Sequence, residues 1–178
     1  MGTSIWRALV AAAALVVSAA CHTTTSTPPP ASAAAPVTIV PPVKPSIAGA
    51  RNPAVTPQTL AQTICKPGWT KTVRPPLSWT APLKRKLLRE QHLPGVVADY
   101  ELDHLISLEL GGAPRDLANL WLEPYEAHGH RFAPSGLGSE SKDVVENVLK
   151  HDVCIGKIDL GEAQRRIATD WTVALAGL

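Results

Sequence analysis

Asp103, His104 and Asn119 are the residues of this sequence whose types and spacing are best suited to chemistry. An imidazole gains or loses a proton near neutral pH, and a carboxylate is a good ligand for a hard cation. The three together therefore predict proton transfer beside a bound metal ion. Each of them alone is more simply explained as a polar residue that satisfies backbone groups of a loop, so the hypothesis depends on the whole set.

The set lies on a pattern that is typical of a β-hairpin with a long loop. Residues alternate from Tyr100 to Leu110, the run Gly111-Gly112-Ala113-Pro114 interrupts this alternation, and a second apolar segment extends from Leu120 to Leu122. Neighbouring side chains on a regular strand point to opposite faces, so Asp103 and His104 can share one site only where the strand ends or bulges. We predict such an irregularity there.

The start of the chain has the pattern of an export signal. Residues 1–20 contain only Arg7 as a charged residue, then an apolar run from Ala8 to Val17, which is too short to span a membrane. Small residues precede Cys21 and resemble a bacterial lipoprotein cleavage site, which predicts a lipidated Cys21 anchored to a membrane of the cell envelope. Ordinary cleavage, leaving a periplasmic protein with a spare thiol at Cys21, is the alternative.

Residues 21–56 are rich in Pro, Ala, Ser, Thr and Val and show neither a helical nor a strand period. Such a segment cannot bury a core, so we expect a disordered linker with an extended, polyproline-like character. The folded part is then residues 57–178, a single small domain. Its two cysteines, Cys65 and Cys154, predict a disulfide in an exported chain, with buried thiols or metal ligands as the alternatives.

Charge is unevenly distributed over this domain. Residues 57–97 contain seven Lys and Arg and one acid, a net charge of +6, whereas residues 98–178 contain seven basic and fourteen acidic residues, a net charge of −7. A basic arm beside an acidic site suits a phosphate polymer. The simpler interpretation is that most of these charges lie on solvated helix faces.

Four helices flank the predicted hairpin, with a short extended segment, Trp69 to Val73, between the first two. The helices are expected from Pro57 to Cys65, from Leu83 to about His92, from Ser139 to about Val153, and from Asp159 onwards. In the third helix the predicted buried stripe is apolar and consists of Val144, Val145, Val148 and Leu149. The predicted outer face consists of Asp143, Glu146, Asn147 and Lys150.

The segments ELDHLISLELGG and NLWLEP together resemble the HNH, or His-Me finger, endonuclease superfamily. The resemblance covers about Tyr100 to Lys150. It implies an α+β domain in which the hairpin and the following helix form a ββα-metal-like unit. It also implies a metal-dependent endonuclease that hydrolyses phosphodiester bonds of nucleic acid, with DNA the expected partner, in a protein that we expect to be a monomer.

The resemblance assigns a role to each residue of the set. His104 matches the general base, Asn119 the residue that orients this histidine, and Asp103 a ligand of a divalent metal, with Mg²⁺ expected and Mn²⁺ or Zn²⁺ as alternatives. Family members place a His or Asn on the helix as the second ligand, and this helix has no unambiguous match. Asp143 is our first choice for it and Glu146 the second. Basic residues expected to meet the substrate are Lys142, Lys71, Arg74, Lys84 and Arg85.

Two other classes of function remain open. The first is an envelope lipoprotein that uses the same fold for binding or scaffolding, without catalysis. The second is a hydrolase of cell-wall sugars that uses Asp103 with Glu101 or Glu123 as a carboxylate pair, for which the sequence contains no motif.

Overall fold

Helices and two strands alternate with short 3₁₀ turns in the computed structural model, which describes residues 49–126 and 136–178. All the described residues belong to one compact unit. The strands are β1 (Tyr100–His104) and β2 (Leu120–Pro124), and the helices are α1 (Trp69–Val73), α2 (Leu77–Glu90), α3 (Ser139–Cys154) and α4 (Leu160–Asp170). This arrangement confirms the predicted α+β class.

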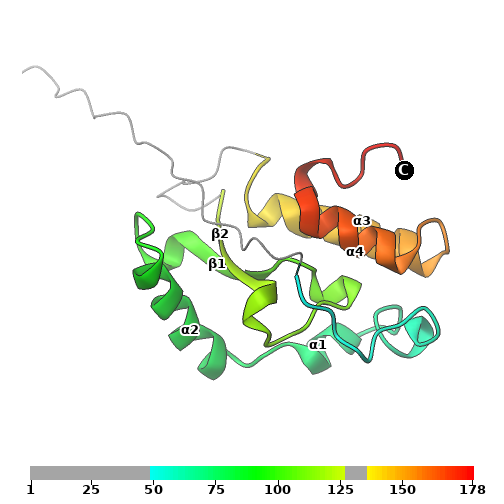
Figure 1. Ribbon diagram of the computed structural model, residues 1–178, viewed down its shortest axis with the longest axis horizontal. Helices are drawn as coiled ribbons and strands as arrows, with labels where there is room; N and C mark the ends of the chain where they lie inside the picture. The colour runs from blue at the N-terminus through cyan, green and yellow to red at the C-terminus, as the bar shows by residue number, and fades with distance from the viewer. Residues whose placement is uncertain (1–48, 127–135) are drawn as a thin grey trace, which may run out of the picture. The chain divides into compact units, whose positions relative to one another are not determined.

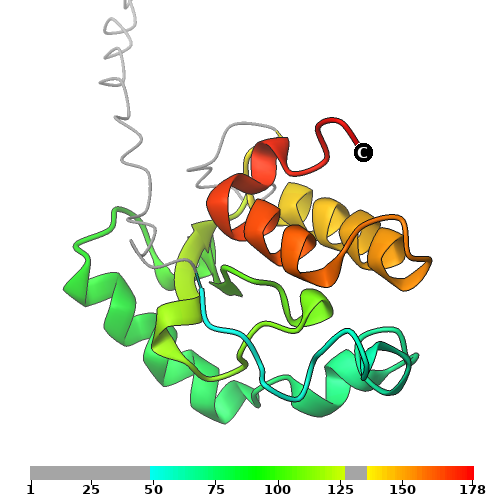
Figure 2. The ribbon, with the colours of Figure 1, turned by 45° about the vertical axis from the view of Figure 1, so that its right-hand side comes forward.

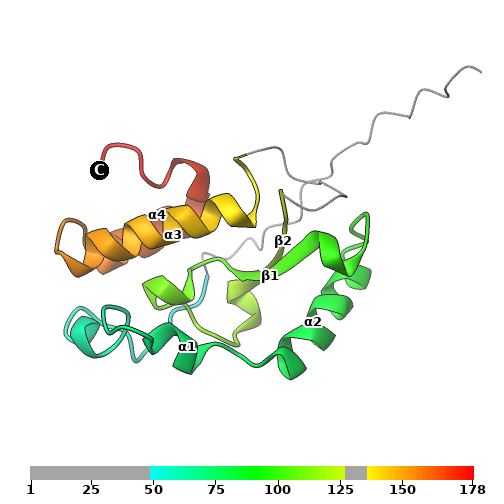
Figure 3. The same ribbon diagram turned by 180° about the vertical axis from the view of Figure 1, so that it is seen from behind.

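The hairpin lies between two groups of helices. α3 and α4 run side by side along one side of the hairpin and its connecting segment, and α1 and α2 lie along the other (Figures 1 and 2). The view from behind shows the same arrangement (Figure 3). β1 and β2 pair antiparallel in a regular register, with Asp103 opposite Trp121 and His104 opposite Leu120.

The first strand is shorter than predicted. β1 ends at His104, and the residues up to Leu110 form a loop and a 3₁₀ turn, Leu108–Leu110, instead of a continued strand. The reason is burial: every residue from 104 to 108 is buried, whereas a strand with one solvated face exposes alternate side chains. Ser107 caps the turn by accepting a hydrogen bond from the backbone N–H of Glu109 at 3.0 Å.

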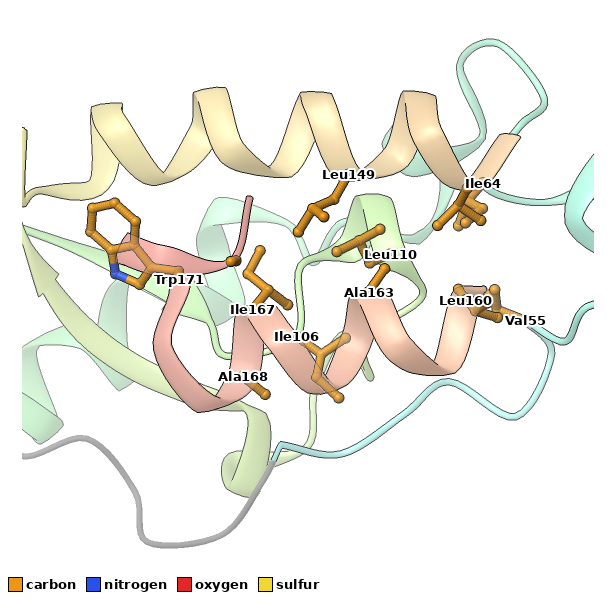
Figure 4. Packing of buried hydrophobic residues seen from close by; sticks show 12 residues of the cluster. Val55, Ile64, Ile106, Leu110, Leu149, Leu160, Ala163, Ile167, Ala168 and Trp171 are labelled. Carbon is orange, nitrogen blue, oxygen red and sulfur yellow. The ribbon is translucent and has the colours of Figure 1, made fainter. Parts of the chain in front are cut away.

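The hydrophobic core fills the space between α3, α4 and this connecting segment (Figure 4). Leu149 comes from α3, Ala163 and Ile167 come from α4, and Ile106 and Leu110 come from the connection. Each of these five side chains is at most 1% exposed. The connection between the strands therefore contributes side chains to the core that are as fully buried as those of the helices.

The predicted faces of α3 are wrong in part. Val144 and Val148 are exposed at 62% and 37%, whereas Lys142 and Glu146 are buried at 1% and 8%. Only Leu149 of the predicted stripe is fully buried. The buried face is rotated because α3 places charged groups, in addition to apolar ones, against the hairpin.

Corrections also apply before the hairpin. Residues 69–73 form the helix α1, not an extended segment, and Gly68 turns the chain into it in the left-handed conformation at φ 79°. α1 ends at Val73, and the next residue, Arg74, is extended before Pro75. The helix predicted from Pro57 to Cys65 is only a 3₁₀ turn, Leu60–Gln62. α2 begins at Leu77, six residues before the predicted Leu83.

The folded region begins before the predicted boundary at Pro57. Arg51 forms a bridge with Gly112, and Val55 is buried against Gly111, where an added Cβ would lie 2.5 Å from the valine Cγ1. The predicted signal segment 1–20, Cys21 and residues 22–48 of the predicted linker lie outside the described residues. Within the described ranges, no helix is both long enough and apolar enough to cross a membrane.

A disulfide joins the two halves of the domain, as predicted. Cys65 follows the first 3₁₀ turn and Cys154 is the last residue of α3, with 5.6 Å between their Cα atoms and a sequence separation of 89. The bond therefore ties the region before the hairpin to the helix after it.

Replacing both Cys65 and Cys154 with Ser is expected to lower the free energy of unfolding by roughly 3 to 5 kcal/mol, because the unfolded chain is then free of a long covalent loop. Urea denaturation of the oxidised protein and of the double variant measures the difference. Reductant should reproduce the loss in the unsubstituted chain and have no effect on the variant. Equal stabilities would contradict the prediction.

Candidate active site at the end of the hairpin

Lys142 connects α3 to the end of β1. Its Nζ donates to Asp103 Oδ2 at 2.7 Å, to the backbone oxygen of His104 at 3.0 Å, and to Glu146 Oε1 one turn further along the helix. The Ser107 hydroxyl donates to the other oxygen of Glu146 at 2.6 Å. The three N–H groups of the ammonium thus have three acceptors, which is what a buried charge requires.

The charges of this cluster depend on one another. Burial by itself lowers the pKa of Lys142, but the carboxylates of Asp103 and Glu146 outweigh it and hold this pKa well above its usual range. Burial opposes ionisation of Asp103, yet Lys142 and a hydrogen bond from Glu123 keep its pKa below the ordinary value. Burial raises the pKa of Glu146 to about 7. The ammonium and the Asp103 carboxylate therefore form the permanent ion pair.

Glu123 of β2 adds a second buried carboxyl group beside Asp103. It is 1% exposed, and neither of its oxygens accepts a hydrogen bond from a donor among the described residues. Burial first, and the Asp103 charge second, raise its pKa to about 10. Glu123 is therefore a neutral acid at pH 7 that donates to Asp103, which explains why its oxygens lack donors.

His104 faces the other way, towards the connecting segment. Its Nε2 lies 3.1 Å from the backbone oxygen of Pro114. A carbonyl oxygen can only accept, so Nε2 carries the hydrogen and Nδ1 is left as the acceptor of the neutral ring. Burial lowers the pKa of His104 below 6.5, more than Asp103 raises it. The imidazole is accordingly neutral at pH 7.

Asn119 does not orient His104 directly, which corrects the predicted role. Its Oδ1 accepts from the N–H of Ile106 at 2.8 Å, and its Nδ2 donates to the carbonyls of Ile106 at 3.0 Å and Ala113 at 3.1 Å. Its amide thus fixes both ends of the connecting segment. Because Ala113 precedes Pro114, Asn119 positions the carbonyl that holds the imidazole, one residue removed from the ring itself.

The glycine turn is part of the same structure. A Cβ on Gly112 would lie 1.7 Å from the carbonyl oxygen of Ile106 and 2.7 Å from Nδ2 of Asn119. A residue larger than glycine at position 112 would therefore collide with the Ile106 carbonyl and with the amide of Asn119. The Gly-Gly turn and Asn119 are therefore one structural unit.

A cleft of about 460 Å³ opens between α2 and β1 beside His104. Arg74 and Lys84 supply positive charge to its wall, and the Nζ of Lys84 lies 5.7 Å from the centre of the Tyr125 ring. Glu101 lines the same cleft, and burial, with the charge of Asp103, raises its pKa to about 7. The cleft thus brings a neutral imidazole, an acid that titrates near neutrality and two cations to one surface.

The other predicted substrate contacts lie elsewhere. Lys71 and Arg85 are exposed and do not line the cleft. Lys142 is buried, and its three hydrogen bonds leave no N–H group for a phosphate. Of the five predicted basic residues, only Arg74 and Lys84 are therefore placed beside His104.

The predicted metal ligands do not fit a divalent cation as they are arranged. The ammonium of Lys142 bridges Asp103 and Glu146. Asp143, the first choice for the second ligand, is exposed, and burial together with the nearby charge of Asp103 raises its pKa. Within residues 49–126 and 136–178, no three His, Cys, Asp or Glu side chains form a group that could hold a metal ion. The carboxyl groups of Asp103 and Glu146 are already paired with the ammonium of Lys142.

The predicted irregularity is present only in part. β1 ends at His104, as required, but the pairing is regular through both residues and there is no bulge. Asp103 bonds to α3 and the ring of His104 bonds to the connecting segment. The carboxylate and the imidazole therefore do not converge on one ion, although they are neighbours in sequence.

Ser107 was not predicted as part of this site, and Glu123 was predicted only as one half of a possible carboxylate pair with Asp103. Ser107 and Glu123 lie in short apolar runs, where a single polar residue has no periodic pattern of its own. The one signal for Glu123 is that it is an acid within the apolar segment LWLEP. An acid in a buried strand needs a partner, because charged residues are rarely buried without one.

Replacing Glu123 with Gln is expected to stabilise the protein at high pH. The folded chain keeps the proton of Glu123 up to about pH 10, whereas the unfolded chain loses it near pH 4.5, so stability falls as pH rises between these values. Gln imitates the neutral acid, so the variant should match the natural chain near pH 4.5 and exceed it at pH 8 by on the order of 1 kcal/mol or more.

Urea denaturation at pH 4.5, 6 and 8 tests this prediction. The exposed Glu90→Gln is the matched control, and its difference from the natural chain should vary little over this range. A Glu123→Gln difference that is constant with pH would contradict a neutral Glu123.

No protein family, curated protein or solved structure matches this chain. The functional conclusion therefore depends on the residues and their geometry.

Proposed function

We propose that this domain hydrolyses phosphodiester bonds of nucleic acid, with His104 as the general base. The observation that carries the proposal is the neutral imidazole of His104, held by the Pro114 carbonyl and lining a cleft that Arg74 and Lys84 make basic. A base with a free acceptor nitrogen and two nearby cations can together promote the attack of water on a phosphate diester.

The chemistry follows from the tautomer of His104. Nδ1 takes a proton from water while the water oxygen bonds to phosphorus, and the bond from phosphorus to the leaving oxygen breaks. That oxygen takes a proton from solvent. Arg74 and Lys84 offset the charge of the phosphate, and the positive charge of Arg74 acts on His104 across the cleft. No step requires the two residues at the end of β1 to share an ion.

The fold supports the same proposal in a coarser way. β1, β2 and α3 follow one another as two strands and a helix, and α3 contacts the end of β1 through Lys142. We take this as the ββα unit of the HNH superfamily. An exported, envelope-anchored enzyme with nucleic acid as its partner is part of the proposal, since residues 1–21 have the pattern of a lipoprotein signal.

Replacing His104 with Ala is expected to lower the rate of cleavage by about 10²- to 10⁴-fold, the usual contribution of a general base. The full chain is incubated with plasmid DNA and with RNA, both with Mg²⁺ and with chelator, and the products are separated by electrophoresis. Because the pKa of His104 lies below 6.5, activity should persist at pH 6.5 and fall at lower pH.

His151→Ala, an exposed substitution near the end of α3, is the matched control and should leave the rate unchanged. Cleavage that survives His104→Ala unreduced would rule out the mechanism. If neither polymer is cleaved by the natural chain, the binding or scaffolding role becomes the better explanation of the same fold.

Replacing Arg74 with Ala is expected to raise KM for the nucleic acid roughly tenfold, because one charge-assisted phosphate contact is lost. Lys71→Ala, three residues earlier and outside the cleft, removes the same charge and should change KM far less. Steady-state kinetics at fixed ionic strength compare the two. Equal effects would indicate a diffuse electrostatic attraction and not a cleft that holds the phosphate.

A further inference from the structure

The cluster around Lys142 has the composition of a cation site whose cation is already present. Two carboxylates, Asp103 and Glu146, contact the ammonium, and the side chains of these acids are only 13% and 11% exposed. Lys142 itself is 2% exposed. A cation, its ligands and their hydrogen bonds are thus all supplied by one chain.

We infer that the ammonium of Lys142 occupies the place that the HNH resemblance assigns to a divalent metal, so that this site works without a bound metal ion. The geometry carries the inference. Asp103, which the resemblance implies is a metal ligand, accepts a hydrogen bond from Nζ of Lys142 at 2.7 Å. The helix residue that faces Asp103 is thus a lysine and not a His or Asn.

A divalent cation would have to displace this lysine. Mg²⁺ and Mn²⁺ require about six oxygen ligands near 2 Å and usually keep several waters. The space between Asp103 and Glu146 holds an Nζ that is bonded to both and to a backbone carbonyl. Removing the ammonium from these acceptors would leave a long buried side chain with an unpaired charge, which is strongly unfavourable.

Lys142 also acts on the proposed base through the backbone. Its third bond, to the carbonyl of His104, fixes the end of β1 against α3 at the residue that carries the imidazole. Lys142 is therefore a positioning residue for His104. This consequence for catalysis rests on the proposed function, and the replacement of a metal by an ammonium rests on the HNH resemblance that is part of that proposal.

The inference predicts that a cation site appears when the lysine is shortened. In Lys142→Ala, the carboxylates of Asp103 and Glu146 and the hydroxyl of Ser107 would surround a space without a cation, and oxygen donors of this kind suit Mn²⁺. The full-length chain and the variant are titrated with Mn²⁺ alone at pH 7, and free Mn²⁺ is followed by electron paramagnetic resonance. The variant should bind about tenfold more tightly or better.

Lys150→Ala is the matched control, because Lys150 lies two turns further along α3 and pairs with Glu109 at 3.4 Å. It should show no gain in Mn²⁺ affinity. Melting temperatures with and without Mn²⁺ supply a second readout: Lys142→Ala should melt at a lower temperature than the natural chain and recover in part when Mn²⁺ is added.

Two results would overturn the inference. The first is a natural chain that binds Mn²⁺ at a site that Asp103→Asn abolishes, and this result does not depend on whether Lys142→Ala folds. The second is a folded Lys142→Ala that gains no affinity. Both are binding results, so they stay distinguishable from a failure of nucleic acid cleavage in the His104 experiment, which would refute the proposed function alone.

Discussion

The buried ammonium of Lys142 is the constraint on which the rest of the structure depends. The side chain of Lys142 is only 2% exposed, and so deeply buried an ammonium stays charged only if each of its N–H groups has an acceptor. Lys142 finds these acceptors on β1 and on its own helix. The helix can therefore approach the hairpin in only one rotation. That rotation places Glu146 inwards and leaves Val144 and Val148 towards solvent.

The same constraint organises the connection between the strands. Glu146 reaches Ser107, which caps the 3₁₀ turn, and Leu110 from that turn packs into the core beneath α3 and α4. Asn119, at the other end of the segment, bonds back to the backbone of Ile106 and Ala113. Polar bonds at both ends and apolar packing in the middle make the long connection a fixed part of the domain, which is what positions the Pro114 carbonyl for His104.

Several of these features can be predicted from the sequence, and the reason others cannot is physical. Alternation and the Gly-Gly turn predicted the paired strands, and an even pair of cysteines predicted the disulfide, because these signals are local or chemical. The predicted inner face of α3 was wrong because the prediction places the most hydrophobic residues of a helix towards the core. A lysine that is buried by its ion pairs contradicts that placement. The predicted role of Asn119 was wrong for another reason: its hydrogen-bond partners are backbone groups, which cannot be identified from the sequence.

The separation of Asp103 from His104 has a consequence for any anionic substrate. Two unit charges about 4 Å apart repel by on the order of 4 kcal/mol near a protein surface, so an unpaired Asp103 would oppose a phosphate at the neighbouring histidine. Lys142 cancels that charge from the far side of the strand, and a neutral Glu123 adds none. The side of the strand that carries His104 then meets Arg74 and Lys84 across the cleft. The internal ion pair on one face of β1 thus removes the charge of Asp103 from the surroundings of a phosphate at His104, and the carboxyl of Glu101, with a pKa of about 7, is the acid that still lines the cleft.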